Sequence, residues 1–322
     1  DLGGKLTFTC DYTKTSPAGT YTITPSGLTS QNYDITYVPG TLTVEQRTYV
    51  AKDGVVYTTI EDALHDPQWE PVVREYFGTL IPMRDHKFAA LHYAVWSGGS
   101  FVYVPEGVTL PYPLQSYFRL NAKGAGQFEH TLIIVEDDAD LHFIEGCSAP
   151  KYNVANLHAG AVELFVGKRA HLRYSTIENW SKNMYNLNTK RVTVGKNSAM
   201  EWVSGSFGSH TSYLYPMTIL KGDNSKMDYT GITFAGAGQE LDTGMKVNHV
   251  GKHTTSSVNT RSICKDGGIS NTRTSVVIAP NADESKSIVG CTSLMLDSKS
   301  RSDTIPAIDV RNQNSDVGHE AK

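Results

Sequence analysis

The stretch from Gly195 to Ser225, GKNSAMEWVSGSFGSHTSYLYPMTILKGDNS, contains one full repeat of the pattern that decides the fold. A small polar turn opens it at 195–198, and a similar turn closes it at 222–225. Between the turns lie short runs in which apolar and polar residues alternate, which is typical of β-strands. The segment therefore predicts strands joined by tight turns, with no helix between them.

The same kind of turn recurs along the chain at near-equal intervals. Copies lie at 137–138, 167–170, 251–254 and 280–283, so successive turns are 27 to 29 residues apart. A fixed period between about 20 and 50 residues indicates a solenoid. A β-sandwich is the alternative, but it predicts turns every ~8–12 residues. From about residue 100 we therefore expect a parallel β-helix, in which each coil buries its inward side chains against the next.

Residues 49–99 have a different, helical character. Residues 60–64 read as a short helix with Thr59 as its N-cap. A second helix is expected over 68–77, where the apolar residues have helical spacing and Gly78 ends it. A third is expected over 88–95. A short helical region is thus predicted before the β-helix.

The first 48 residues form a separate β segment. Alternation predicts strands over 20–24, 33–37 and 41–44, with turns at 25–27 and 39–40. Threonine and tyrosine dominate this segment, and charged residues are scarce. We therefore expect three regions: a β segment over 1–48, helices over 49–99 and the β-helix over 100–322.

Composition excludes several classes of protein. The chain has 322 residues, 19% of them charged, and a net charge of −4, without a basic stripe that would bind nucleic acid. Its apolar runs are far shorter than the ~18–20 residues of a membrane-spanning helix. The chain begins at Asp1 without a signal-peptide pattern. This start is expected to be a fragment boundary, so localisation cannot be taken from it.

The four cysteines are widely spaced. Cys10, Cys147, Cys264 and Cys291 form no C-x-x-C motif, which argues against a zinc ribbon or a thioredoxin motif. Cys147 and Cys291 occupy similar places in their coils, about five coils apart. At ~4.8 Å per strand this separation is roughly 24 Å. The two thiols therefore cannot bind one small cluster within one chain, although they can stand at two ends of a transfer path.

Two parts of the chain resemble known families. Residues 20–44 resemble the MBG-type β-modules repeated in bacterial surface proteins. Residues from about 54 to 320 resemble the SufB family in motifs that occur in the family's order: KFAAL (87–91), GSFVYVP (99–105), YFRLNA (117–122), GQFE (126–129), EGCSAP (145–150), YNLNTKR (185–191), DTG (242–244), RSDT (301–304) and GHEA (318–321).

The SufB resemblance implies both a fold and a function. The family's core is a right-handed parallel β-helix, in agreement with the period found above. Its members are scaffolds, rather than enzymes, that build a transient iron–sulfur cluster in the cytoplasm. They act with the ATPase SufC and with the paralogue SufD or a second copy, and their sulfur comes from a cysteine desulfurase or a carrier. No nucleic acid or membrane partner is implied.

The resemblance also implies roles for individual residues. Cys147 matches the cysteine that receives sulfur, and Cys291 matches a cysteine near the SufD interface. The residues that match an internal sulfur path are Arg119, Asn121, Glu178, Trp180 and Lys190. His319 and Glu320 match residues that help Cys291 to hold the cluster. Thiolate chemistry suits these roles, because a neighbouring Arg or Lys lowers the pKa of a thiol and iron in clusters favours thiolate ligands.

Two departures from the family pattern affect these expectations. Glu178 stands where many members have glutamine, and a carboxylate there would raise the pKa of a nearby thiol. The chain ends at Lys322, so the C-terminal helical lobe that docks SufC is expected to be absent.

Two further functions are considered. The MBG-like start favours a bacterial surface or adhesion protein, which would place the chain at the cell surface. A carbohydrate-active β-helix enzyme is disfavoured, because it needs clustered carboxylates in a groove and the acidic residues here lie mainly in turns.

Overall fold

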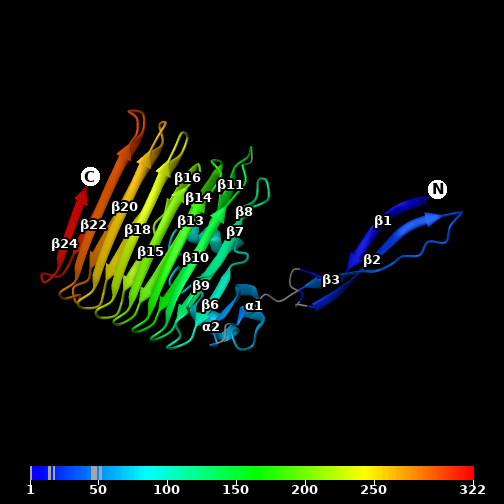
Figure 1. The fold of residues 1–322 in the computed structure, drawn as a ribbon, viewed down its shortest axis with the longest axis horizontal. Coiled ribbons are helices and arrows are strands. Elements are labelled where there is room, and N and C mark those ends of the chain that lie inside the picture. The colour runs from blue at the N-terminus through cyan, green and yellow to red at the C-terminus, as the bar shows by residue number, and fades with distance from the viewer. Residues whose placement is uncertain (1, 14–15, 17–18, 45–48, 51–52, 152) are drawn as a thin grey trace. The chain divides into compact units, whose positions relative to one another are not determined.

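The computed structural model describes residues 2–13, 16, 19–44, 49–50, 53–151 and 153–322. Its internal contacts divide the chain into two compact units, Asp1–Thr48 and Tyr49–Lys322. Figure 1 shows the larger unit as a row of parallel strands. In the described residues no helix is long and apolar enough to span a membrane.

The small unit is a three-stranded antiparallel sheet in the order β1-β2-β3, with strands Leu2–Cys10, Gly19–Ser30 and Gly40–Val44. The strands predicted over 20–24 and 41–44 are confirmed as parts of β2 and β3. The turn predicted at 25–27 is wrong, because β2 continues through it. A register shift within β1, between Gly4 and Thr7, and the positive φ of Gly27 in β2 mark an irregularity in this ladder, not a chain reversal.

The strand predicted over 33–37 is also wrong, because these residues adopt no strand conformation. The Tyr37 hydroxyl is hydrogen-bonded to both the backbone N–H and the carbonyl of Leu28. The segment is thus attached to β2 through a side chain. Alternation in the sequence cannot distinguish this attachment from a backbone ladder.

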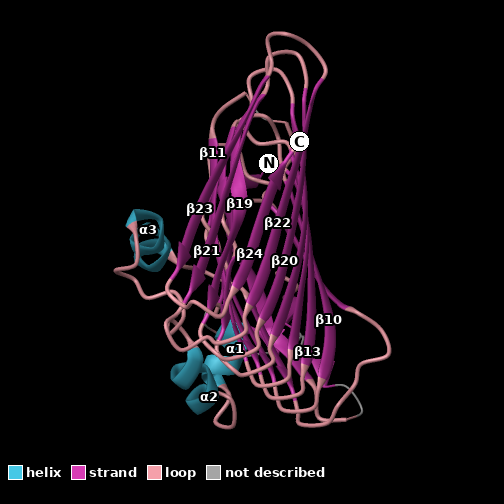
Figure 2. Cartoon of the chain, turned by 90° about the vertical axis from the view of Figure 1, so that its left-hand side faces the viewer, coloured by secondary structure: helices cyan, strands magenta, loops and turns pink. Residues whose placement is uncertain are grey.

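The three helices occur where the sequence predicts them. Their bounds are Ile60–His65 for α1, Glu70–Tyr76 for α2 and Lys87–Val95 for α3. The Thr59 hydroxyl caps α1 by accepting the N–H of Asp62, and Gly78 follows α2 with a φ of 76°. The helices contact strands of the larger of the two solenoid sheets, on its outer side (Figure 2).

From β6 onwards the described chain forms a parallel β-solenoid, as predicted. One sheet has eight strands: β7 (Leu114–Arg119), β10 (Asp140–Ser148), β13 (His171–Asn179), β15 (Ala199–Phe207), β18 (Lys226–Ala235), β20 (Thr255–Cys264), β22 (Lys286–Met295) and β24 (Asp316–Ala321). The other sheet contains β4 (Tyr49–Val50), β5 (Val56–Thr59), β6 (Ser100–Val104), β8 (Gly126–Gln127), β9 (His130–Val135), β11 (Asn156–His158), β12 (Ala161–Val166), β14 (Met184–Val194), β16 (Thr211–Leu214), β17 (Met217–Leu220), β19 (Glu240–His249), β21 (Ile269–Ile278) and β23 (Arg301–Val310).

The predicted turns are the corners at which the chain passes from one sheet to the other. Each corner contains one non-glycine residue in the left-handed conformation: Asp138, Arg169, Asn197, Asn224, His253 or Glu284. Such a residue recurs every 27 to 31 positions. The chain passes from one sheet to the other and back in each coil, and its strands pair in parallel with those of the next coil, which excludes the antiparallel β-sandwich.

The interior of the solenoid has two chemical halves. Strict alternation turns every second side chain inward, as in β10 and β13. Near the corners these inward residues are apolar and form the main core, which includes Leu141, Phe143 and Leu172. Further along the same strands the inward residues are polar, beginning with Glu145 and Thr176. This polar half contains the candidate site.

Candidate functional site

Cys147 lies in the interior because β10 alternates regularly. Glu145 and Cys147 are two residues apart on this strand, so both side chains point inward and both are buried. Gly146 between them faces outward, where the ring of Tyr117 occupies the space that a side chain would need. The thiol packs with Leu120, Trp180 and Met184. An acidic residue is therefore fixed beside the cysteine by strand geometry alone.

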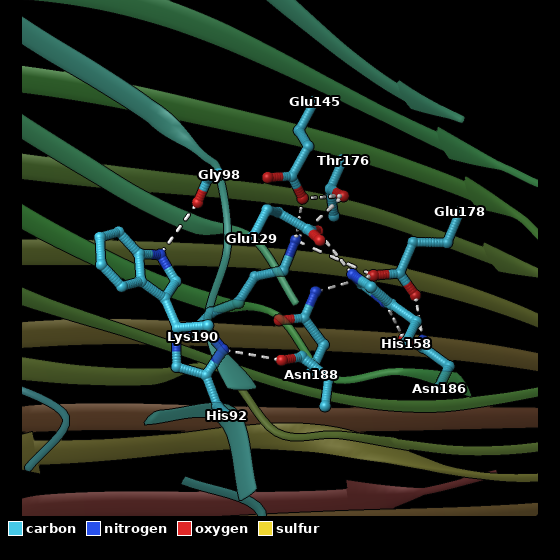
Figure 3. Close-up of polar contacts among 12 residues, drawn as sticks. His92, Gly98, Glu129, Glu145, His158, Thr176, Glu178, Asn186, Asn188 and Lys190 are labelled. Carbon is cyan, nitrogen blue, oxygen red and sulfur yellow. Dashed lines mark hydrogen bonds and ion pairs between the residues drawn. The ribbon is translucent and has the colours of Figure 1, made fainter. Parts of the chain in front are cut away.

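Glu145 is the centre of a buried ion pair. Its carboxylate accepts a hydrogen bond from the Lys190 ammonium at 2.6 Å, and both side chains are fully buried. Tyr174 donates its hydroxyl to the other carboxylate oxygen, and Thr176 donates to the first. Burial alone would lower the pKa of Lys190, but Glu145 and Glu178 raise it above its ordinary value. The lysine is therefore charged (Figure 3).

Glu178 lies on β13 directly beside Cys147, since the two are register partners. Its carboxylate accepts the amide of Asn186 at 2.6 Å and that of Asn188 at 3.4 Å, both from β14 in the facing sheet. The Lys190 ammonium is 3.9 Å away. Glu178 and Lys190, predicted as parts of one path, therefore do lie in one polar network.

A second ion pair, between Glu129 and His158, completes this network. The His158 Nε2 donates to Glu129 at 2.5 Å, and its Nδ1 donates to the Asn186 carbonyl oxygen at 2.7 Å. Asn186 uses its amide nitrogen on Glu178, so its oxygen is the acceptor. Both imidazole nitrogens are thus protonated. Burial opposes this charge, but Glu129 outweighs burial and raises the pKa of His158 to about 9.

The surroundings of Cys147 keep its thiol protonated. Burial raises its pKa well above the ordinary value, and the carboxylates of Glu145, Glu129 and Glu178 raise it further. Lys190 is the opposing charge, and it does not compensate. The expected lowering of this pKa by neighbouring cations is therefore outweighed. Glu178 raises the pKa of the Cys147 thiol, as the sequence predicts.

Trp180 closes the site on one side. Its ring lies 4.7 Å from the imidazole of His158 and packs in the same cluster as Cys147. The indole N–H is buried and, within the described residues, has no hydrogen-bond acceptor. An unused buried donor is costly unless something accepts from it. Trp180 thus carries a free buried donor in the cluster that contains Cys147.

Arg119 and Asn121 lie elsewhere. Arg119 points outward at the end of β7, and its Nε donates to Asn121 at 2.9 Å on the exposed side of the chain. Inward positions on β7 belong to Ser116 and Phe118, the latter being the register partner of Cys147. Two of the five predicted path residues are thus outside the buried network.

Two neighbouring rows of mostly polar residues run along one sheet between the strands of Cys147 and Cys291, and each row contains one of the two cysteines. The two cysteines lie on β10 and β22 of one sheet, five strand spacings apart, which is about 24 Å at ~4.8 Å per strand. The row that ends at Cys291 runs through Glu145, Thr176, Ser204, Gly231 and Thr260, and the row that starts at Cys147 runs through Glu178, Ser206, Thr233, Ser262 and Ser293. The serines and threonines of β13, β15, β18 and β20 in these rows are buried.

His319 and Glu320 lie on β24, the edge strand beside β22. Val289 pairs with His319 and Cys291 pairs with Ala321, so His319 shares the inward face of Cys291. Its Nε2 is buried without a partner in the described part of the chain. Glu320 faces outward and is in an ion pair with Lys322. Among the described residues no three His, Cys, Asp or Glu side chains form a metal-binding group.

A further buried cluster, which no sequence pattern indicates, connects the helical region to the solenoid. Glu163 on β12 accepts the backbone N–H groups of Gly78, Leu80 and Ile81, which follow α2. Its Oε2 also accepts from His130 Nε2 at 2.9 Å. We refer to Glu163 with these three N–H groups as the helix clamp.

Two buried histidines lie beside the helix clamp. His92 Nδ1 donates to the Ala159 carbonyl at 2.8 Å, and its Nε2 lies 3.1 Å from His130 Nδ1. His130 Nε2 lies 2.9 Å from Glu163 on its other side. Burial, and after it the neighbouring His130, lowers the pKa of His92 to about 4.

Comparison with known proteins shows the family to which the chain belongs. Residues 118–322 match the model of the SUF system FeS cluster assembly SufBD core domain, and residues 2–43 match the MBG domain of the YGX type. An iron–sulfur cluster assembly SufBD family protein of Staphylococcus epidermidis is 46% identical over 269 residues, and the iron–sulfur cluster assembly protein SufB of Bacillus subtilis is 45% identical over 269 residues. Each alignment covers 84% of this chain and 57% of the relative, so the chain spans a little over half of their length. The chain belongs to the SufBD family.

Proposed function

We propose that this chain is a scaffold on which iron–sulfur clusters are assembled, and that it is not itself an enzyme. The observation that carries the proposal is the pair of buried polar rows between Cys147 and Cys291. Apolar side chains would stabilise a solenoid interior at least as well. The hydroxyl groups that the two rows together place on β15, β18 and β20 instead offer successive hydrogen bonds to a sulfur species that moves between the cysteines.

In this proposal Cys147 receives sulfur. Its thiol attacks the terminal sulfur of a donor persulfide, R–S–SH, and forms Cys147–S–SH while R–SH leaves. A carboxylate of the network takes the thiol proton and returns it to the leaving thiolate, so the charge balances. The persulfide then accepts from the free indole N–H of Trp180 and lies near the Lys190 ammonium.

Cys291 and His319 are proposed to hold the nascent cluster, which is the scaffold's cargo. Thiolate and imidazole are established ligands of iron in clusters. Glu320 is proposed as a further ligand, although it must first leave Lys322 and reach around the edge of β24. Arg119 and Asn121 are proposed to act at the outer surface near β7, where sulfur would enter.

The proposed partners follow from the family. They are a SufC-like ATPase, which would carry the ATPase activity, a SufD-like paralogue or a second copy, and a cysteine desulfurase or sulfur carrier. This role would be carried out in the cytoplasm.

Anaerobic reconstitution with ferrous iron and sulfide tests the cluster site. The visible absorption of the cluster should form on the unchanged chain and should be largely lost in Cys291→Ser and reduced in His319→Ala. Cys264→Ser is the matched control, because Cys264 is also buried and lies on the neighbouring strand β20. Equal absorption in Cys291→Ser and Cys264→Ser would remove Cys291 from the proposal.

Sulfur transfer is tested separately. The chain is incubated with a cysteine desulfurase, cysteine and no iron, and protein-bound persulfide is located by mass spectrometry. Persulfide should be found on Cys147 and should disappear in Cys147→Ser, while Cys264→Ser should not affect it. Persulfide that accumulates equally without Cys147 would contradict the assigned entry point.

A further inference from the structure

A pocket of about 270 Å³ lies outside the solenoid, between the start of α3 and the outer face of β14, β16, β17 and β19. The rings of Phe88, Tyr213 and Tyr215 form part of its wall, and those of Phe88 and Tyr213 are inclined by 31° with centroids 5.9 Å apart. Thr189 lies on β14 with its side chain facing outward. The proposed function uses none of these side chains.

The charge of this pocket is positive. Lys87 and Lys246 line it, and each ammonium lies over an aromatic ring, 5.0 Å from the centroid of Phe88 and 5.6 Å from that of Tyr215. In the described part of the chain neither lysine forms an ion pair. Arg191 and Asp85 also line the pocket but neutralise each other at 2.7 Å. The two lysines thus leave a net charge of about +2 on the pocket wall at pH 7.

The size of the pocket limits what it can hold. Cavities of about 150 Å³ accept benzene, and larger ligand sites in proteins start near 300 Å³. The pocket therefore has space for one ring with an anionic group and is too small for a dinucleotide. Flat aromatic walls suit a ring, and compact ammonium groups suit a phosphate or carboxylate.

We propose that this pocket is a binding site for a small anionic aromatic molecule, in which Lys87 and Lys246 hold the anionic group and the tyrosine rings hold the ring. The site is independent of the cysteines, so its failure would leave the scaffold role untouched. Because its charges are partly exposed, we expect binding to weaken as salt rises.

Isothermal titration of the full chain with phenyl phosphate, inorganic phosphate and phenol tests the proposal. Phenyl phosphate should bind at least about tenfold more tightly than either fragment, since ring and anion contribute together. Lys87→Met and Lys246→Met should each weaken binding by about two- to fivefold, the range for partly exposed charge pairs. Lys221→Met, an exposed lysine outside the pocket, is the matched control.

A filling variant distinguishes the pocket from general surface charge. Met217→Trp fills the pocket with a bulkier aromatic side chain and keeps both lysines. It should therefore abolish phenyl phosphate binding while the circular dichroism spectrum stays unchanged. Inorganic phosphate that binds as tightly as phenyl phosphate would overturn the proposal. Binding that is equal in Met217→Trp or in both lysine variants would also overturn it.

Discussion

Replacing Glu163 by glutamine should release the helical region from the solenoid. The carboxylate is fully buried and accepts four hydrogen bonds, from the N–H groups of Gly78, Leu80 and Ile81 and from His130. Glutamine has nearly the same size, but its NH₂ group cannot accept. One oxygen position therefore becomes a donor that faces other donors.

The magnitude follows from the burial of this carboxylate. A hydrogen bond to a charged group contributes about 1.5–3 kcal/mol, but bonds to one carboxylate are not additive. Each buried donor left without an acceptor costs about 1–3 kcal/mol. We therefore expect Glu163→Gln to lower the free energy of unfolding by about 3–5 kcal/mol, at the high end for single substitutions.

Urea unfolding followed by circular dichroism measures this difference. Hydrogen exchange locates it, because the amides of Gly78, Leu80 and Ile81 should exchange much faster in the variant. Glu75→Gln is the control, since Glu75 is exposed on the neighbouring helix α2 and should change stability by less than about 0.5 kcal/mol. If Glu163→Gln unfolds like Glu75→Gln, the helix clamp does not hold the helical region.

Three further predictions concern the site. The pKa of His158 is raised in the folded chain, so its protonated ring stabilises the fold fully below the unfolded pKa of about 6.5, and this stabilisation is lost as the pH rises towards the folded pKa of about 9. Stability should therefore fall by up to about 3 kcal/mol between these pH values. In His158→Gln this pH dependence should be absent, and a pH profile parallel to that of the unchanged chain would contradict the charged pair. Glu178→Gln should move the pH midpoint of Cys147 alkylation by iodoacetamide downwards and Lys190→Met should move it upwards, and a common midpoint in both would show that these charges do not act on the thiol. Gly208→Ala should destabilise the chain by more than about 2 kcal/mol, because a Cβ there would clash with the carbonyl oxygen of Trp180. Gly107→Ala is the control: Gly107 also has a positive φ but no neighbouring atoms, so its replacement should cost only about 1 kcal/mol. Equal melting temperatures of the two variants would show that the contact with Trp180 relaxes.

The solenoid could be predicted because its signal is local and repeated. Each corner needs a residue in the left-handed conformation, and short polar residues, which tolerate it best, take this position at Asp138, Asn197 and Asn224. Local signals also located the helices, since Thr59 marks the start of α1 and Gly78 follows the end of α2. In the small unit the same type of reasoning failed at 25–27, because a glycine within an irregular strand looks like a glycine in a turn.

The site was only partly predictable, because its pairs join residues that are far apart in the sequence. Alternation on β10 fixes Glu145 beside Cys147, so that neighbour was available from the sequence although it was not singled out. The partners of His158 and Glu163 depend on which coils lie next to each other and on which helix covers them. For Arg119 the alternation of β7 itself decides the outcome: Phe118 faces inward, so Arg119, the next residue, faces outward and lies outside the network.

The arrangement of the interior argues that its polar half is retained for a purpose other than stability. The same strands that supply Leu141, Phe143 and Leu172 to the apolar core supply Glu145, Cys147 and Glu178 a few residues later. Repeating the apolar pattern along the whole strand would avoid the desolvation of five charged groups: Glu129, Glu145, His158, Glu178 and Lys190. The chain instead compensates each charge with a partner from another strand, and the unused indole N–H of Trp180 is left beside the thiol. Within the described residues the Oε2 of Glu129 and the Oδ1 of Asn188 in this network also lack a partner. Stability alone does not explain such an interior, whereas the proposed transient anionic sulfur species would have a use for the free donor.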